Sequence, residues 1–320
     1  SSIEIPNIPV DEIQIVSSTG ALSLSKIPKS LLVIGGGYIG LEMGSVWSRL
    51  GSKVTVVEAL DRIVPTMDGE IAKEFMKMLT KQGLEFKLSH KVSSAKSGKS
   101  GVDVEMETSD KKKIKENYEI VLMSVGRKPT PAGQGLENSG RKWPEQNAIE
   151  IKDNFQTSVE GIYAIGDVAP GPMLAHKAEE EGVACVEFIT GQKPHINYDA
   201  IPAIVYTNPE IASVGKTEEQ LKQEKKDFKV GKFPFMANGR ALTTSASEGF
   251  VKILVDKQTD EILGAHIIGH DAGQLIAEIV TTIEFGGSAE DIARVCHAHP
   301  TTSEAVKEAA FSVDGRAIHI

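Results

Sequence analysis

The stretch SLLVIGGGYIG, residues 30–40, carries the strongest fold signal in this 320-residue chain. Its first half, Ser30–Ile34, is a short apolar run typical of a buried parallel strand. Gly35, Gly37 and Gly40 follow with the spacing G-x-G-x-x-G. In such a unit the first glycine permits a tight turn, the second lets a ligand approach the backbone, and the third lets helix and strand pack closely. The stretch therefore matches the fingerprint of a dinucleotide-binding α/β domain.

The segment after the glycines extends this pattern. Its spacing predicts a helix over residues 38–50, with Gly51 as its stop, and then a strand over 53–57 that ends at Glu58. An acid at this place accepts hydrogen bonds from an adenosine ribose and repels a 2′-phosphate. The order of strand, glycines, helix, strand and acid predicts a Rossmann-type domain that binds NAD in preference to NADP.

The next segment predicts a continuation of the same sheet. We expect elements in this order: an amphipathic helix over 68–81, a strand over 85–92, a hairpin of 102–107 and 114–118, and a buried strand over 119–125. Ligands of open α/β sheets lie beyond the carboxyl ends of the strands. Gly126, directly after the last strand, is therefore expected to approach the nicotinamide half of the cofactor, a simple turn being the alternative.

A second polar motif lies in the middle of the chain. Residues 157–167 read as a short apolar strand that ends in Gly166 and Asp167. This Asp can present a carboxylate to the hydroxyl groups of a ligand, although an Asp-capped turn fits the residues equally well. A helix expected to open within 171–179 brings its first amides to the same region, and His176 on it is a weaker candidate.

The stretch CHAHPTTSE, residues 296–304, combines a histidine, a proline and a glutamate. Pro300 restricts the backbone of His299 to extended or turn conformations, with a cis bond as one option. Glu304 can then reach one ring nitrogen and fix the tautomer that a histidine base needs. Residues 301–304 also fit a capping box in which Thr301 starts the helix, so both interpretations stay open here.

The composition excludes several classes of protein. A formal charge of −9 without a basic tract argues against nucleic-acid binding, and no apolar stretch is long enough to cross a membrane. Cys185 and Cys296 form neither a disulfide framework nor a metal cluster, so no metal site is expected. Both cysteines are expected to be small packing residues. Residues 1–10 lack the features of a signal peptide, and a reducing intracellular compartment is expected.

Together these motifs resemble the flavoprotein disulfide reductases, the class I pyridine nucleotide-disulfide oxidoreductases, and most closely their dihydrolipoamide dehydrogenase group. Glutathione and mercuric reductases share the folds and the His-Pro…Glu pair but typically use NADP, with basic residues near the position of Glu58. The acid here favours the lipoamide group. The resemblance covers the whole chain and rests on residues 35–58, 126–127, 166–182 and 296–304, with support from 201–210 and 232–240.

The resemblance implies an α/β fold made of a Rossmann-type NAD-binding domain, a remnant of a FAD-binding domain and a C-terminal α+β dimerisation domain. The implied domains are 1–26, the tail of the FAD-binding domain; 27–148, the NAD-binding domain; 149–198, the remaining FAD or central segment; and 199–320, the dimerisation domain. The family's FAD glycine fingerprint and its redox-active Cys-x4-Cys pair do not occur in this sequence. We therefore expect the chain to be a shortened form of such an enzyme.

The resemblance also implies NAD and FAD as cofactors and assigns residues to each. His299 matches the catalytic base, held by Glu304, and in this family the pair reaches the partner subunit's site across a homodimer interface. Asp167 matches the aspartate at the flavin ribityl chain, and Met173, Leu174, Ala175 and His176 match the segment beside the flavin ring. The NAD contacts match Gly35, Gly36, Gly37, Tyr38, Ile39, Gly40, Leu41, Glu42, Glu58, Val92 and Gly126.

The implied function is the oxidation of protein-bound dihydrolipoamide, with electrons passing through FAD to NAD⁺. The implied partners are the lipoyl domains of 2-oxo acid dehydrogenase complexes, of which the enzyme is the E3 component, and the implied location is the mitochondrial matrix. The chain by itself is expected to bind NAD(H) weakly and to turn over little lipoamide. Two alternatives stay open: a non-catalytic NAD-binding or interaction fragment, and a reductase for another disulfide such as glutathione.

Overall fold

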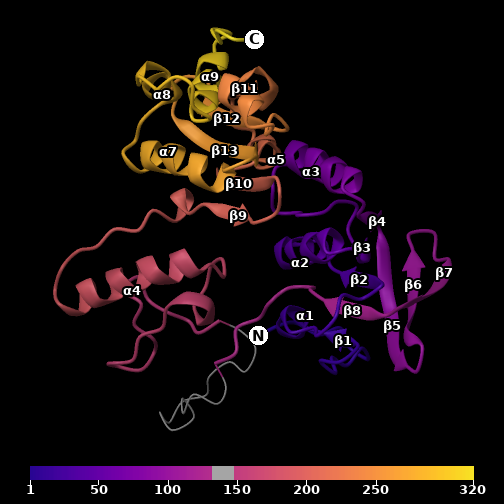
Figure 1. The fold of residues 1–320 in the computed structure, drawn as a ribbon. Coiled ribbons are helices and arrows are strands. Elements are labelled where there is room, and N and C mark those ends of the chain that lie inside the picture. The colour runs from indigo at the N-terminus through magenta and orange to yellow at the C-terminus, as the bar shows by residue number, and fades with distance from the viewer. Residues whose placement is uncertain (132–147) are drawn as a thin grey trace. The chain divides into compact units, whose positions relative to one another are not determined.

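The computed structural model describes residues 1–131 and 148–320, and within them the protein has the expected α/β fold (Figure 1). These residues form two compact units, each described by itself below. The smaller unit contains residues 1–3 and 126–198, and the larger contains 4–125 and 199–320. Residues 132–147 of the predicted NAD-binding domain lie outside the described residues, and the four predicted domain boundaries stay predictions.

The first part of the larger unit is built on a parallel sheet with the strand order β1-β8-β2-β3-β4. Its central strands are almost entirely buried, which explains why they read as continuous apolar runs in the sequence. The predicted Rossmann-type parallel sheet is confirmed, with helices packed on one face and the antiparallel strands of residues 90–118 on the other. The bounds are β1 (Ile15–Val16), α1 (Ser18–Leu22), β2 (Ser30–Ile34), α2 (Tyr38–Arg49), β3 (Lys53–Val57), α3 (Gly69–Lys81), β4 (Glu85–Lys87) and β8 (Ile120–Met123).

A separate antiparallel sheet is inserted between β4 and β8. It consists of β5 (His90–Gly98), β6 (Gly101–Thr108) and β7 (Lys113–Tyr118), and the last two form the predicted hairpin. The prediction of one strand over 85–92 is wrong, because the chain leaves the parallel sheet at Ser89. This residue has a left-handed backbone with φ 55°, and its N–H donates to the Leu60 carbonyl 2.8 Å away instead of to a neighbouring strand.

The C-terminal part of the larger unit contains a further antiparallel sheet with the order β11-β12-β13-β10-β9. Strands and helices occur together here, as expected for the α+β architecture of the C-terminal region. The bounds are β9 (Ala203–Val205), β10 (Glu210–Gly215), α5 (Glu218–Gln223), β11 (Phe228–Pro234), α6 (Gly239–Thr243), β12 (Phe250–Asp256), β13 (Ile262–Gly269), α7 (Ala272–Glu284), α8 (Ala289–Arg294) and α9 (Glu304–Ser312).

The described residues of the smaller unit form the long helix α4 (Ala175–Ile189) and the short 3₁₀ helix η2 (Gly166–Val168). The predicted strand over 157–167 is wrong. In the described structure this segment forms a single isolated bridge, between Gln156 and Tyr163, because Gly161 at φ 77° turns the chain inside it. The helix expected to open within 171–179 begins at Ala175, since Gly171 at φ 108° and the following proline lie in a non-helical turn.

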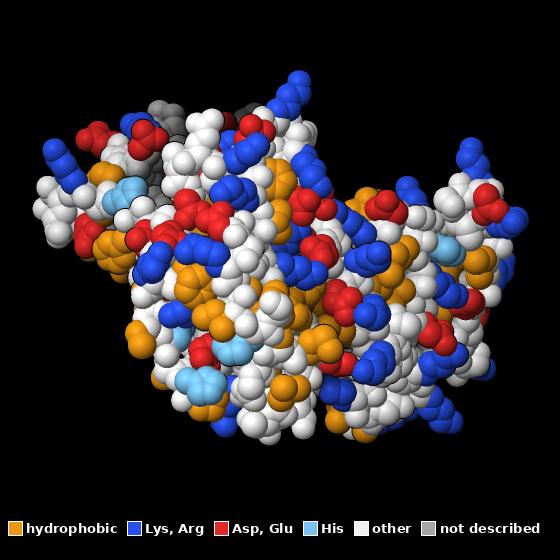
Figure 2. Space-filling model, turned by 90° about the horizontal axis from the view of Figure 1, so that it is seen from above, with side chains coloured by type: hydrophobic (Ala, Val, Ile, Leu, Met, Phe, Trp, Pro, Cys, Tyr) orange, Lys and Arg blue, Asp and Glu red, His pale blue; other side chains and the backbone are white. Residues whose placement is uncertain are grey.

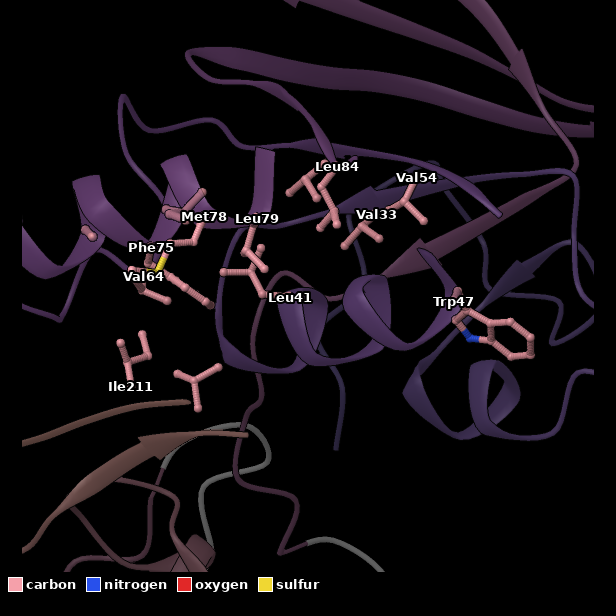
Figure 3. Close-up of a cluster of buried hydrophobic side chains, with 14 of the residues drawn as sticks. Val33, Leu41, Trp47, Val54, Val64, Phe75, Met78, Leu79, Leu84 and Ile211 are labelled. Carbon is pink, nitrogen blue, oxygen red and sulfur yellow. The ribbon is translucent and has the colours of Figure 1, made fainter. Parts of the chain in front are cut away.

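One hydrophobic cluster joins the two parts of the larger unit. Figure 3 shows Val33 of β2 and Leu41 of α2 in one cluster with the apolar side chains of α3, and Ile211 of β10 on the side of Val64 and Phe75. All five side chains are buried. Because each buried side chain of this size contributes about 1.5–3 kcal/mol, the shared cluster stabilises the association of residues 4–125 with 199–320.

A buried ion pair crosses the same boundary. Lys252 on β12 places its Nζ 3.0 Å from Asp68 Oδ1 and 2.7 Å from Glu218 Oε2. The side chains of Lys252 and Asp68 are each only 1% exposed. Asp68 is also the N-cap of α3, because its Oδ1 accepts the N–H of Glu70. Burial lowers the pKa of Lys252, but the carboxylates of Glu218 and Asp68 outweigh it and hold this pKa above its ordinary value.

His266 lies opposite Lys252 on the neighbouring strand β13 and is completely buried. Its Nε2 contacts the Lys216 carbonyl at 3.0 Å, whereas its Nδ1 has no hydrogen-bond partner among the described residues. Burial lowers the pKa of His266 below the ordinary 6.5, and the nearby charge of Asp68 offsets this only in part. The folded protein therefore keeps this imidazole neutral at pH values where the unfolded chain already protonates it.

The surface is charged with both signs. On the face shown in Figure 2, Lys and Arg side chains lie next to Asp and Glu side chains and do not form one continuous basic area. Some of these charges form exposed ion pairs, such as Lys81 with Glu248 at 2.6 Å. Every helix in residues 1–131 and 148–320 is too short or too polar to cross a membrane.

We expect Lys252→Met to lower the free energy of unfolding by about 3–5 kcal/mol, because it leaves the buried Asp68 carboxylate without its cation. Chemical denaturation followed by circular dichroism measures the change. Lys81→Met is the matched control, since Lys81 also joins α3 to the C-terminal part of the chain but is exposed. The control should change stability little. Equal effects of the two substitutions would contradict a special role for the buried pair.

Stability should also depend on pH through His266. Because its folded pKa lies below the ordinary 6.5, the unfolded state binds more protons as the pH falls below that value, and the folded state loses stability. Between about pH 7 and about pH 5.5 this group alone lowers the free energy of unfolding by up to about 1.4 kcal/mol per pH unit. Urea titrations at both pH values should show a flatter dependence for His266→Gln, but not for the exposed His270→Gln.

Candidate functional site

The three glycines of the first motif have distinct surroundings. Gly35 has φ 106°, and a Cβ there would lie 2.4 Å from the Ser124 carbonyl oxygen. A Cβ on Gly40 would lie 2.3 Å from the Gly35 carbonyl oxygen, so a larger residue would collide with the turn at this position. A Cβ on Gly37, by contrast, would meet no heavy atom within 4 Å. The first and third glycines are required by the turn and its packing, and the second faces open space.

The N-terminus of α2 opens at this glycine turn. Gly37 is its N-cap, and no side-chain hydrogen bond caps this end of the helix in the described structure. Such an end presents backbone N–H groups and a partial positive charge, which together bind anions. Tyr38 and Ile39, in the first turn, are half-buried, and the hydroxyl of Tyr38 contacts Thr66 Oγ1 at 3.2 Å. The geometry fits the pyrophosphate of a dinucleotide.

Glu58 lies beside the same turn, as its position after β3 predicts. Its Oε2 accepts the N–H of Gly36 at 2.7 Å, and its Oε1 accepts the N–H of Leu60 at 2.9 Å. The side chain is half-buried and held at both oxygens. Each carboxylate oxygen has a second lone pair, so Glu58 can still accept hydrogen bonds from ribose hydroxyl groups.

The remaining predicted NAD contacts have structural roles of their own. The side chains of Leu41 and Val92 are buried in hydrophobic clusters, so only their backbone groups are available to a ligand. Glu42 accepts the N–H of Tyr206 at 2.8 Å and thereby joins α2 to the C-terminal part of the chain. Burial raises the pKa of Glu42, and this hydrogen bond offsets the effect only in part. Gly126, in the smaller unit, has φ 121°.

Two buried charged side chains of α4, Lys177 and Glu181, support the turn that contains Asp167. Asp167 is exposed in η2, and the N–H of the preceding Gly166 donates to Glu181 Oε2 at 2.7 Å. Glu181 also pairs with Lys177 at 2.9 Å, and both side chains are only 1% exposed. Lys177 and Glu181 were missed in the sequence, where their spacing of four on α4 was the one available signal. They fix the turn that presents the Asp167 carboxylate.

The segment predicted to contact a flavin ring leads into the same helix. Met173, Leu174 and His176 are half-buried and Ala175 is exposed. Leu174 is the N-cap of α4, whose N-terminus has no side-chain cap, and α4 contacts η2. Within the smaller unit the structure therefore brings the Asp167 turn and the helix together.

His299 and Glu304 form the expected pair. His299 Nδ1 lies 3.0 Å from Glu304 Oε1, and the other oxygen of Glu304 accepts the N–H of Thr301 at 2.8 Å. Because the carboxylate accepts, Nδ1 carries the proton and the neutral ring has its lone pair at Nε2. No described residue forms a hydrogen bond with Nε2, and the His299 side chain is 71% exposed. The ring is arranged to accept a proton from a ligand at Nε2.

The surroundings of this pair correct two predictions. Helix α9 begins at Glu304 and not at Thr301, whose hydroxyl donates to the Ala298 carbonyl at 2.8 Å instead of capping the helix. Burial raises the pKa of Glu304, but the N–H of Thr301 and the ring of His299 outweigh it, so this pKa is lowered. The predicted packing role of Cys296 is wrong, since the chain leaves the packed layer after α8 and this thiol is exposed. His299–Pro300 is a cis bond.

The second cysteine and the acidic residues add no further site. Cys185 on α4 is buried, as expected, and burial raises the pKa of its thiol. No group of three or more His, Cys, Asp or Glu side chains within the described ranges is arranged to hold a metal ion.

Comparisons with known proteins agree with these features. The sequence profile of pyridine nucleotide-disulphide oxidoreductases matches residues 2–182, and the profile of their dimerisation domain matches 201–310. The chain is 58% identical to dihydrolipoyl dehydrogenase 1, mitochondrial, from Arabidopsis thaliana, over 99% of this chain and 62% of that protein. It is 49% identical to dihydrolipoyl dehydrogenase 3 from Pseudomonas putida, over 99% of this chain and 68% of that protein.

A solved structure shares the architecture. The crystal structure of LpdA from Mycobacterium tuberculosis superimposes with a TM-score of 0.88 at 26% identity, covering 97% of this chain and 67% of that one. The chain thus spans about two thirds of the length of the proteins it matches. The profile match, the identities and the shared fold lead to one conclusion: the chain belongs to the pyridine nucleotide-disulphide oxidoreductase family.

Proposed function

We propose that this chain carries the NAD-binding and dimerisation regions of a dihydrolipoyl dehydrogenase, the E3 component of 2-oxo acid dehydrogenase complexes. The observation that carries the proposal is the His299–Glu304 pair, 3.0 Å apart, with Nε2 of the exposed ring directed away from the carboxylate. The names of the Arabidopsis and Pseudomonas relatives support lipoamide as the substrate. Because the chain spans 62% of the Arabidopsis relative, the activity of the whole protein is part of the proposal.

In the proposed reaction His299 acts as a general base. Its Nε2 takes the proton of a dihydrolipoamide thiol and leaves a thiolate, which is the nucleophile in thiol–disulfide exchange. The imidazolium formed is stabilised by Glu304, whose lowered pKa keeps it ionised at neutral pH. The N–H of Thr301 holds the second oxygen of Glu304, so the carboxylate cannot rotate away when the ring becomes charged.

The glycine turn and the Asp167 turn are the proposed cofactor sites. Gly35, Gly36, Gly37, Tyr38, Ile39 and Gly40 would hold the NAD pyrophosphate, Glu58 the ribose, and Leu41, Glu42, Val92 and Gly126 would complete the site. The open space at Gly37 and the uncapped helix end fit this assignment. Asp167 would bind the hydroxyl groups of FAD beside Met173, Leu174, Ala175 and His176, and its exposure fits that role. When bound, FAD and NAD⁺ supply the path for two electrons.

The assembly and location follow from the same proposal. The dimerisation profile over 201–310 supports a homodimer formed through the C-terminal part of the chain. The proposed partners are lipoyl domains of 2-oxo acid dehydrogenase complexes. The proposed location is the mitochondrial matrix, because the Arabidopsis relative is named mitochondrial, although the name of the Pseudomonas relative gives no location.

Two glycine substitutions should separate NAD binding from folding. Gly37→Ala should leave the free energy of unfolding of this chain nearly unchanged, since the added methyl group enters open space, but should weaken NADH binding at least about tenfold by blocking the pyrophosphate. Gly40→Ala should destabilise the fold by about 1–3 kcal/mol, because its methyl group collides with the Gly35 carbonyl. Fluorescence titration with NADH and chemical denaturation measure the two effects. Undiminished NADH binding by Gly37→Ala would contradict the assignment.

The catalytic role is tested by extending the chain at its N-terminus with the matching part of the Arabidopsis relative. His299→Gln in this protein should lower kcat with dihydrolipoamide about 10²–10⁴-fold, because the base is removed, while the Kd for NADH stays the same. His270→Gln serves as the control for replacing an exposed histidine. Unchanged kcat after His299→Gln would refute the assigned base.

The same extended protein separates the remaining alternatives. With NADH as reductant, reduction of glutathione disulfide in preference to lipoamide would make glutathione disulfide the substrate. NADH binding without reduction of either disulfide would leave an NAD-binding module as the function.

A further inference from the structure

The loop that carries His299 contains a second histidine with the opposite exposure. Residues 295–303 connect α8 to α9, and His297 and His299 lie two positions apart in this loop. The His297 side chain is 6% exposed, whereas that of His299 is 71% exposed. One imidazole is therefore buried against the protein while the other is directed to solvent.

His297 ties the beginning of the loop to α7. Its Nε2 lies 2.7 Å from Glu278 Oε1 on that helix, and its Nδ1 lies 3.1 Å from the Val295 carbonyl oxygen. The same carbonyl accepts a hydrogen bond from Lys307 Nζ of α9 at 2.7 Å. Since a hydrogen bond to a carboxylate is charge-assisted, the contact of His297 with Glu278 is stronger than its contact with the neutral Val295 carbonyl.

The end of the loop is anchored separately. The buried Asn238 donates its Nδ2–H to the Thr301 carbonyl at 3.0 Å, and Glu304 accepts the Thr301 N–H at 2.8 Å. His299 thus lies between two anchor points, His297 and Thr301. The position of its ring relative to Glu304 depends on both.

A cavity lies beside the contact between His297 and Glu278. A cavity of about 400 Å³ is bordered by Glu278, Asp291, Ile292, Val295 and His297. The charged groups around His297 are Glu278 on α7, Asp291 on α8 and Lys307 on α9. Without the bond between His297 and Glu278, the start of the loop has room to move into this cavity, and the ring of His299 moves with it.

We propose that the hydrogen-bonded pair of His297 and Glu278 positions the proton-accepting His299, holding the loop so that Nδ1 of His299 stays on Glu304. His297 and Glu278 are thus positioning residues that act through His299. The inference rests on the proposed function, because it assigns these residues to the same base.

The test reads the tautomer of His299 directly in this chain. Nitrogen chemical shifts of ¹⁵N-labelled histidine rings distinguish a proton on Nδ1 from one on Nε2, and slightly alkaline solution keeps the ring neutral. The wild-type chain should show the Nδ1–H form at His299. His297→Ala should lose this preference, Glu278→Gln should lose less because the amide oxygen still accepts a hydrogen bond, and His270→Ala should change nothing. Glu304→Ala, which removes the direct acceptor of Nδ1–H, should abolish the preference.

Each outcome has a separate meaning. If Glu304→Ala shifts the signal but His297→Ala and Glu278→Gln do not, the positioning proposal is overturned while the His299–Glu304 pair stands. If Glu304→Ala also has no effect, the pair itself fails, and the proposed function with it. Should His297→Ala not fold, Glu278→Gln decides, because it preserves the side-chain volume and the cavity.

Discussion

The larger unit depends on the burial of one ammonium group. Lys252 comes from β12, its carboxylate partners come from the start of α3 and from α5, and Lys252 and Asp68 are nearly inaccessible to water. A buried ion pair adds little net stability, because the lost hydration of both charges offsets their attraction. Separating the partners is nevertheless costly, since each charge would stay buried alone. The pair therefore restricts the packing of α3 on the C-terminal sheet to arrangements in which these groups meet.

The two candidate sites of the larger unit are supported in different ways. Around the glycine turn, close contact of backbone atoms fixes the geometry, and Gly40 has no room for even a methyl group. Around His299, hydrogen bonds that Glu304 accepts and one that Asn238 donates to Thr301 fix a loop that has no regular structure. A binding site for a rigid pyrophosphate suits the first kind of support. The proton transfer proposed for His299 suits the second, because the carboxylate of Glu304 is held beside the ring where a positive charge would form.

Local patterns predicted most of the fold and part of the sites. Apolar runs and glycine spacing identified the strands and helices around residues 30–58, because the physical cause of each lies within a few residues. The contact of Glu304 with His299 was predicted for the same reason. The turn at Ser89 was not, since its left-handed backbone is stabilised by Leu60 from another segment. The partnership of Lys252 with Asp68 spans 184 positions, and no sequence pattern signals a contact of that kind.

The two hydrogen bonds of Glu58 have a consequence for how this site can evolve. The carboxylate that would choose between cofactors also stabilises the glycine turn through the N–H of Gly36. A change of Glu58 to a basic residue, which would admit a 2′-phosphate, also removes the side-chain acceptor of the Gly36 N–H and so weakens the turn. Altered cofactor preference requires a second substitution that supplies a new acceptor for this N–H. A substitution at Glu58 therefore changes both the cofactor preference and the stability of the glycine turn.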